Sequence, residues 1–340
     1  MGYGHPRSSN LPGRRAQKVL EDFADKTAKY FGGSHVTFHY DSDAANGLSI
    51  LSAGRLAREA GREHIIASPV ERASVVTALK TLRSEGSTVS ILKIDGNGKV
   101  IPESLTELYT NRTGLVTCIW VNGISGVVQP VPELSRMVHS TDTWFHSDAC
   151  DAAGRIEIDL SDTGINLITI CSLKLGGPAG AAATIMSNID PWVISAARKF
   201  SSMTNIAGVA GMVAALDVMG TGIEPRSRIV NKLRQEFLDG IDACDVNYSV
   251  VGGSLPHLLP GTALLNIDRV PEKLHLKLEL ENVILPSHNS SDRLSYLERI
   301  GLDISNPDQY LGFSIDAVNT SVDIKHFVRS FLNVISDGWR

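Results

Sequence analysis

Short apolar runs alternate with longer amphipathic segments through the first half of the chain. The runs occupy residues 35–43, 64–71, 88–95, 114–122, 143–150, 165–174 and 180–186. Segments with helical periodicity lie between most of them, at 46–61, 72–86, 102–111 and 130–140. Short strands that are apolar on both faces and alternate with helices predict an α/β fold with a mostly parallel, seven-stranded sheet covered on both sides.

Glycine and proline positions agree with these boundaries. Gly61, Gly86 and Gly114 stand where helices are expected to end, and a left-handed residue at that point favours glycine. Pro102 and Pro132 stand where helices are expected to begin, because the first turn of a helix tolerates proline.

The pattern changes in the last third of the chain. Helical periodicity marks 208–220, 225–241, 272–281 and 321–335, and strand-like runs lie at 246–253, 262–267 and 310–316. This mixture predicts a second, smaller α+β domain. We therefore expect a large sheet domain over residues 12–238 and a small domain over 239–340, with residues 1–11 packing alongside the small domain.

Composition narrows the classes of protein that fit. The 340 residues are 43% hydrophobic and carry a net charge of −5, which excludes disorder and argues against a nucleic-acid binder. No apolar run reaches the roughly 18–20 residues that span a bilayer, and the N-terminus lacks the apolar core of an export signal. We therefore expect a cytoplasmic protein that does not bind a membrane. We also expect no metal site, because the four cysteines lack CxxC spacing: Cys118, Cys150, Cys171 and Cys244.

Polar residues follow the apolar runs at the edge of the sheet where ligands bind in such folds. They are Asp41, Ser42, Asp43, Glu71, Arg72, Asn122, Asp148 and Lys174. Each alone is typical of a cap or turn. Together, a carboxylate and a lysine suit pyridoxal phosphate, because Lys174 can form a Schiff base and Asp148 can hold the pyridine nitrogen protonated.

Four stretches in a fixed order carry a family resemblance. They read GHPRSSNLPGRRA, VNGISGVVQPVPEL, FHSDACDAAGRIEIDL and SLKLGGPAGAA. In this order they resemble the cysteine desulfurase branch of the class V aminotransferases, over about residues 4–220. The resemblance implies the type I fold of pyridoxal-phosphate-dependent transferases, a homodimer, pyridoxal phosphate as cofactor and, by analogy, partners in iron–sulfur cluster assembly.

The resemblance assigns roles to individual residues. Lys174 matches the Schiff-base lysine, Asp148 the carboxylate on the pyridine nitrogen, and His146 the histidine shortly before it. Asn122 matches the first asparagine of the family's VNNE stretch. The other cofactor-binding positions are Ser42, Asp43, Arg72, Asp151, Cys171 and Ser172, and at most of them the residue differs from the family's.

The departures follow from the same matching of motifs. Asp43 stands for a phosphate-binding Thr, Arg72 for a His that stacks on the ring, and Asp151 for a Gln. A larger group also departs: Cys171 for Ser, Leu173 for His, Gly123 and Ile124 for Asn and Glu, and Phe200 and Met203 in the element that reaches the partner's phosphate.

Two further departures concern the desulfurase reaction. Asn289 lies where the family carries a nucleophilic Cys, and Gly312 lies where it carries an Arg that holds the substrate carboxylate. A persulfide cannot form by nucleophilic attack without a thiolate, and glycine does not replace a bidentate guanidinium. The resemblance therefore predicts a degenerate homologue that has lost cysteine desulfuration.

Asp43 has two interpretations. An ionised aspartate only accepts hydrogen bonds, so it repels a phosphate, but it is a good helix N-cap. We expect Asp43 to cap its own helix and to fill the anion site internally. In the alternative, Asp43 turns aside and Ser42 binds the phosphate.

Lys174 and Arg72 also have two interpretations each. Lys174 forms a Schiff base, or it pairs with Asp148 or Asp151. Nearby carboxylates favour its ammonium form, which works against attack on an aldehyde. Arg72 either stacks on a ring or neutralises these carboxylates, and we favour neutralisation.

Three functions remain open at this point. The chain is a dimeric scaffold or regulatory homologue without desulfurase activity, a pyridoxal phosphate enzyme of altered chemistry that uses Lys174, or a binder of small molecules in the emptied cleft. Three other features are interpreted as structural or incidental: Cys150 and Cys171 as core thiols, His288 as a surface residue, and the glycines of LGGPAG as turn formers.

Overall fold

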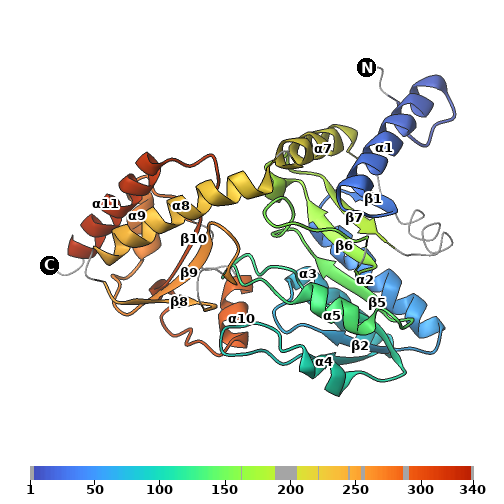
Figure 1. Ribbon diagram of the computed structural model, residues 1–340, viewed down its shortest axis with the longest axis horizontal. Coiled ribbons are helices and arrows are strands. Elements are labelled where there is room, and N and C mark those ends of the chain that lie inside the picture. The colour runs from blue at the N-terminus through green and yellow to red at the C-terminus, as the bar shows by residue number, and fades with distance from the viewer. Residues whose placement is uncertain are drawn as a thin grey trace. The chain divides into compact units, whose positions relative to one another are not determined.

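The seven apolar runs form the seven strands of one sheet in the computed structural model (Figure 1). The strands are β1 (His35–His39), β2 (His64–Ala67), β3 (Thr88–Ile91), β4 (Thr113–Thr117), β5 (Trp144–Asp148), β6 (Leu167–Cys171) and β7 (Ala182–Met186). Their order is β1-β7-β6-β5-β4-β2-β3. The prediction of a mostly parallel, seven-stranded α/β sheet is confirmed. The structure describes residues 4–161, 163–187, 205–220, 222–243, 246–253, 257–285 and 291–337.

One strand of this sheet runs against the others. β7 is antiparallel to both of its neighbours, β1 and β6, whereas β6, β5, β4, β2 and β3 pair in parallel. The strand β1 therefore points the same way as β6. The carboxyl ends of six strands consequently meet at one edge, where the polar residues singled out above follow them.

The helices of this unit follow the predicted alternation. They are α1 (Leu11–Tyr30), α2 (Ser42–Glu59), α3 (Ala73–Ser84), α4 (Glu103–Leu108), α5 (Val131–Val138), α7 (Ile206–Gly220) and a short 3-10 turn, η1 (Leu173–Leu175). α2 runs along the sheet in contact with β1 and with β4 to β7 (Figure 1). The periodicity analysis missed α1, whose start is fixed by Asn10, since its side chain accepts from the Gly13 N–H at 2.9 Å.

Two of the three glycines expected at helix ends do end helices. Gly61 and Gly86 follow α2 and α3 with φ of 76° and 104°, in the left-handed region that favours glycine. Gly114 is a correction, because it lies inside β4. Its lack of a side chain lets the strand pass close to the backbone of Arg62.

The C-terminal unit contains a second sheet. Its antiparallel strands β8 (Tyr248–Val251), β9 (Thr262–Ile267) and β10 (Tyr310–Ser314) lie in the order β10-β9-β8. The helices are α8 (Ile223–Asp242), α9 (Leu274–Leu280), α10 (Ser291–Arg299) and α11 (Ser321–Asp337), with a 3-10 turn, η3 (Pro307–Gln309). Its mostly aliphatic core contains an aromatic cluster, in which Phe237 packs against Phe313 and Phe327 at centroid distances of 4.2 and 4.8 Å.

The chain divides into two compact units at a different place from the expected 238/239 boundary. The second unit comprises residues 94–100, 121–129 and 222–340, and residues 4–11 fall in the first. α8 belongs to the second unit because its buried face, with Leu233, Phe237 and Ile241, joins that unit's core. Sequence periodicity alone does not say which core a helix face meets.

No single helix among the described residues is both long and apolar enough to cross a membrane. Two consecutive helices with a bend between them, Ile206–Met219 and Ile223–Asp242, are long and apolar enough only when they are taken together. Val209, Met212 and Leu216 of the first helix are buried within the protein.

Candidate functional site

Four charged side chains meet at the carboxyl edge of the sheet. Arg72, which precedes α3, lies with Nε 3.0 Å from Asp148 Oδ2 and Nη2 2.8 Å from Asp151 Oδ2. Lys174 Nζ lies 2.7 Å from Asp151 Oδ1. The two cations and two carboxylates thus form one connected network, which we call the edge network. These ion pairs are the ones expected if Arg72 neutralises the carboxylates and if Lys174 pairs with Asp151.

Asp148 is the buried centre of the edge network. Its side chain is 1% exposed, and it accepts from Asn46 Nδ2 at 2.7 Å and from the Cys150 N–H at 2.9 Å. Burial alone raises the pKa of Asp148, but Arg72 and these hydrogen bonds outweigh it and hold the pKa below its usual range. The charge of Asp148 in turn raises the pKa of Arg72 against the cost of burial. Both side chains are therefore ionised at neutral pH.

Lys174 reaches the edge network from the 3-10 turn that follows β6. Its side chain is 42% exposed, whereas that of Asp151 is 6% exposed. The turn ends at Gly176, whose φ of 79° favours glycine, and a side chain on Gly177 would collide with the Ser172 hydroxyl. The interpretation of these glycines as turn formers is consistent with this geometry.

The start of α2 corrects one expectation. The N-cap is Asp41, whose side chain accepts from the Ala44 N–H at 2.7 Å, and not Asp43. Ser42 and Asp43 occupy the first turn, and Asp43 is exposed. Asp41 is the N-cap because its backbone is extended, with ψ of 171°, and its side chain can therefore reach the free N–H groups of the first turn.

His146 lies inside the sheet rather than at its edge. Its ring is fully buried and contacts Thr117 Oγ1 at 3.0 Å and Thr169 Oγ1 at 3.3 Å. Burial lowers its pKa to about 4, against the opposing charge of Asp148. The side chain is therefore neutral and its two nitrogens hold neighbouring strands together.

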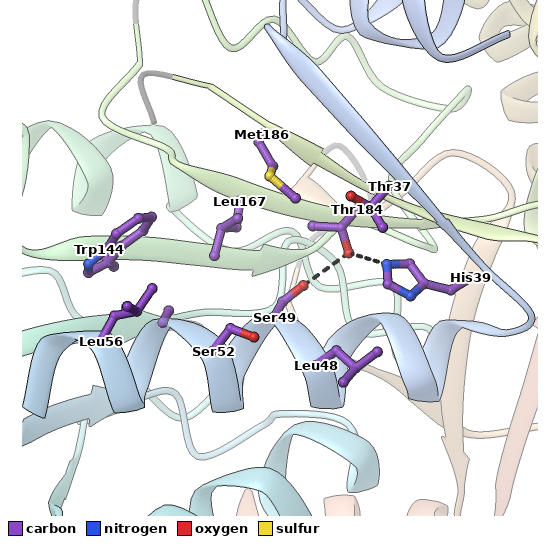
Figure 2. Close-up of a pocket in the computed structure, with 11 residues that line it drawn as sticks. Thr37, His39, Leu48, Ser49, Ser52, Leu56, Trp144, Leu167, Thr184 and Met186 are labelled. Carbon is purple, nitrogen blue, oxygen red and sulfur yellow. Dashed lines mark hydrogen bonds between the residues drawn. The ribbon is translucent and has the colours of Figure 1, made fainter. Parts of the chain in front are cut away.

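A narrow cavity of about 40 Å³ lies under α2, and Figure 2 shows its lining. On one wall Thr184 Oγ1 lies 3.0 Å from Ser49 Oγ and 3.1 Å from His39 Nε2. Burial lowers the pKa of His39 to about 4. This polar chain fastens α2 to β7 and β1, and it thereby holds Asn46, one turn earlier on α2, against Asp148.

Cys171 and Ser172 lie where β6 enters its turn. Ser172 is fully buried and its hydroxyl has no hydrogen-bond partner in the structure. Cys171 is partly exposed and the preceding strand's Cys150 is buried.

Two other predicted positions belong to the second unit. Asn122 falls in the second unit, where its side chain accepts from the backbone N–H groups of Ile124 and Ser125. Gly312 lies in β10, also in the second unit. Five residues lie outside the described part of the chain: Phe200, Met203, Cys244, His288 and Asn289.

Sequence reasoning missed Asn46 as a partner of Asp148. Its position four residues after Ser42 places it on the same face of α2, one turn further on, and this spacing was the available signal. It also did not pair Cys150 with Cys171, since residues 21 positions apart meet only through strand register. Within the described residues, no cluster of three His, Cys, Asp or Glu side chains is arranged to hold a metal ion.

The whole fold matches solved structures of one kind. A NifS-like protein superposes with a TM-score of 0.87 over 98% of this chain and 92% of its own, at 23% identity. A NifS-like protein from Rickettsia africae ESF-5 superposes with a TM-score of 0.83, at 24% identity and the same coverage. The chain therefore has the type I fold of pyridoxal-phosphate-dependent enzymes.

Sequence comparison names the family within that fold. The model of aminotransferase class V matches residues 2–287. The putative cysteine desulfurase IscS 1 of Bacillus subtilis (strain 168) is 25% identical over 89% of this chain and 87% of its own length. A cysteine desulfurase of Trichormus azollae is 24% identical over 98% and 86%. The chain belongs to the class V aminotransferases, in their cysteine desulfurase branch, and the predicted resemblance is confirmed.

Proposed function

We propose that this chain is a class V aminotransferase homologue in which the edge network takes the place of the coenzyme, so that it does not release sulfur from cysteine. The observation that carries the proposal is the bridge from Lys174 to Asp151 at 2.7 Å and from Arg72 to both carboxylates. The amine that would bind the coenzyme is engaged by the carboxylate of Asp151 instead.

The donor set at the edge fits pyridoxal phosphate poorly. The cofactor carries an anionic phosphate and an anionic ring oxygen, which need hydrogen-bond donors or cations. Asp43 and Asp151 are acceptors, and at about 4 Å a carboxylate opposes another anion by several kcal/mol in a medium of intermediate dielectric. Asp148 already accepts three times, from Arg72, Asn46 and Cys150. We therefore derive no chemical step through the coenzyme.

The proposed role in place of catalysis is that of a homodimeric scaffold or regulatory homologue, with iron–sulfur cluster assembly as the setting by analogy with cysteine desulfurases. A connected ion network can maintain the fold without a ligand, because each buried charge is compensated. The dimer is testable directly, since light scattering should give about twice the chain mass of 36.6 kDa.

One observation favours a second candidate, a pyridoxal phosphate enzyme of altered chemistry. Asp148 is buried, ionised and oriented by Asn46 and the Cys150 N–H, which is what a partner of the pyridine nitrogen requires. The partly exposed Lys174 is also within reach of a ligand.

The test is a titration of the purified protein with pyridoxal phosphate, followed by borohydride reduction. We expect no saturable visible band, and no sulfide on adding cysteine and a reductant. A reducible band that disappears in Lys174→Ala but persists in Lys80→Ala, an exposed lysine of α3, would support the second candidate instead. Sulfide release that depends on Lys174 would overturn the loss of desulfuration.

A variant that removes the charge of Asp151 adds a case in which coenzyme binding is expected, beside the wild-type chain in which it is not. Asp151→Asn removes the anion that holds Lys174, so we expect the visible band to appear in this variant. The matched control is Asp142→Asn, which removes a carboxylate whose side chain is 92% exposed. Absence of a band in Asp151→Asn, with the fold retained by circular dichroism, would show that Asp151 is not what blocks the coenzyme.

A further inference from the structure

Two cysteines come together at the carboxyl edge of the sheet. β5 and β6 are parallel neighbours in which Asp148 pairs with Thr169, and Cys150 and Cys171 each follow two residues later on the same face. The register continues past β5, because the Ala149 N–H donates to the Thr169 carbonyl at 2.9 Å. The register therefore places the two cysteines side by side at neighbouring strand ends.

The surroundings of the two sulfurs differ. Cys171 is partly exposed, and its sulfur accepts from the backbone N–H groups of Lys174 and Leu173. Cys150 is fully buried, and its thiol also lies 3.7 Å from the Thr169 carbonyl oxygen. The Cys171 sulfur is therefore accessible to solvent and surrounded by hydrogen-bond donors, whereas the Cys150 sulfur is buried.

Electrostatics separates the two thiols further. The hydrogen bond from Cys150 lowers the pKa of Cys171 to about 6 against the effect of burial, with help from the turn N–H groups and from Arg72. Burial raises the pKa of Cys150. The charges that act on this pair are those of Arg72 and Asp148, and Arg72 is in turn paired with Asp151, which also binds Lys174. Of the two thiols, Cys171 is therefore the one that ionises more readily.

We propose that Cys171 and Cys150 form a thiol-modification site for hydroperoxides, in which Cys171 is the attacking thiolate and Cys150 the resolving thiol. The Cys171 sulfur attacks one peroxide oxygen, the O–O bond breaks, and the other oxygen leaves with a proton as water or alcohol. The resulting sulfenic acid loses its hydroxyl as water when the Cys150 sulfur attacks. The two electrons of the new disulfide have passed to the peroxide.

The strand register favours a disulfide at this place, because it puts Cys150 opposite Cys171 and adjacent strands are typically about 4.8 Å apart, within the Cα separation that disulfides span. The site does not require the coenzyme or the loss of desulfuration, so it stands whatever the outcome of the pyridoxal phosphate titration. Cys118 provides an internal contrast, since it is fully buried and burial raises its pKa.

The test treats the fully reduced protein with one to a few equivalents of hydrogen peroxide and maps cysteine-containing peptides by mass spectrometry. We expect the peptides of Cys150 and Cys171 to become linked by a disulfide that dithiothreitol reverses. In Cys150→Ser the sulfenic acid at Cys171 should accumulate and react with dimedone. In Cys171→Ser the Cys150 thiol should stay reduced, because it is buried.

Alkylation by iodoacetamide gives a second readout that does not involve peroxide. The rate at Cys171 should reach half its maximum near pH 6, and Arg72→Met should move this midpoint upward. Cys118→Ser is the matched control and should change neither result. Oxidation elsewhere with Cys150 and Cys171 still reduced, or an alkylation midpoint at the ordinary thiol pKa, would overturn the proposal.

Discussion

At the scale of single residues, burial decides which charges this protein keeps. Asp148 and Asp151 are almost completely buried and bridged by Arg72, and the charge of Arg72 helps to hold the pKa of Asp148 below its usual range. His39 and His146 are buried with no such bridging cation or anion, and their pKa values fall to about 4. Burial disfavours the charged form in every case, so Asp148 stays charged because of its cationic partner, whereas the two histidines become neutral.

Replacing Arg72 tests the worth of the edge network. We expect Arg72→Met to lower the free energy of unfolding by about 3–5 kcal/mol, because it leaves the buried carboxylate of Asp148 without a counter-charge, while Asp151 keeps Lys174. Urea unfolding measures the change. The matched control is Arg55→Met, which breaks an exposed pair with Glu85 and should cost about 1 kcal/mol or less. Equal losses in the two variants would contradict a buried network.

The buried histidines predict how stability depends on pH. Each has a lower pKa in the folded chain, about 4, than in the unfolded chain, 6.5, so the unfolded chain takes up protons first. The free energy of unfolding should fall between pH 6.5 and 4, by up to about 3 kcal/mol for each histidine. Asp148 titrates below this window, since its pKa is held below 3.8.

The measurement is urea unfolding at intervals from pH 7 to 4.5. His146→Gln should flatten the slope, whereas His139→Gln, at an exposed position, should leave it unchanged. A slope that is the same in all three proteins would mean that His146 does not titrate as the structure implies.

At the scale of elements, α2 connects the cap, the cavity and the edge network. Asp41→Ala removes the N-cap and should lower the free energy of unfolding by about 1 kcal/mol. Asp43→Ala removes only a charge near the helix N-terminus and should cost a few tenths of that, through the helix dipole. Thermal or urea unfolding separates the two, and a larger loss in Asp43→Ala would reinstate it as the cap.

Two glycines of α2 make a matched pair for packing. A Cβ on Gly54 would press into the side chain of Leu82, which is fully buried in α3, so Gly54→Ala should destabilise by about 1–3 kcal/mol. A Cβ on Gly47 meets nothing within 4 Å, so Gly47→Ala should stabilise by up to about 1 kcal/mol through helix propensity. Changes of the same sign in urea unfolding would contradict the close contact between α2 and α3.

At the scale of the whole molecule, net charge limits the partners. The chain carries −5 at neutral pH and its pI is about 6.1. We expect no retention on immobilised heparin or DNA at pH 7.5, because there is no cationic excess to release counterions from a polyanion. Retention that weakens steeply with salt would reveal a local basic surface that the net charge conceals.

The hydrophobic pattern of the chain predicted the seven strands and most of the helices, and four sequence motifs predicted the family. These features are local, because alternation, periodicity and turn residues act over a few positions. The same local reading placed Asp148, Lys174 and Arg72 at one edge, since parallel strands end together.

Only the tertiary structure decided which partners these residues take. Asn46 reaches Asp148 from 102 positions away, and Asp41 rather than Asp43 caps α2 because of its backbone angles. α8 joined the second unit because its apolar face met that core, and Cys150 met Cys171 through strand register. Contacts of this kind depend on the distances that folding creates, which no stretch of sequence contains.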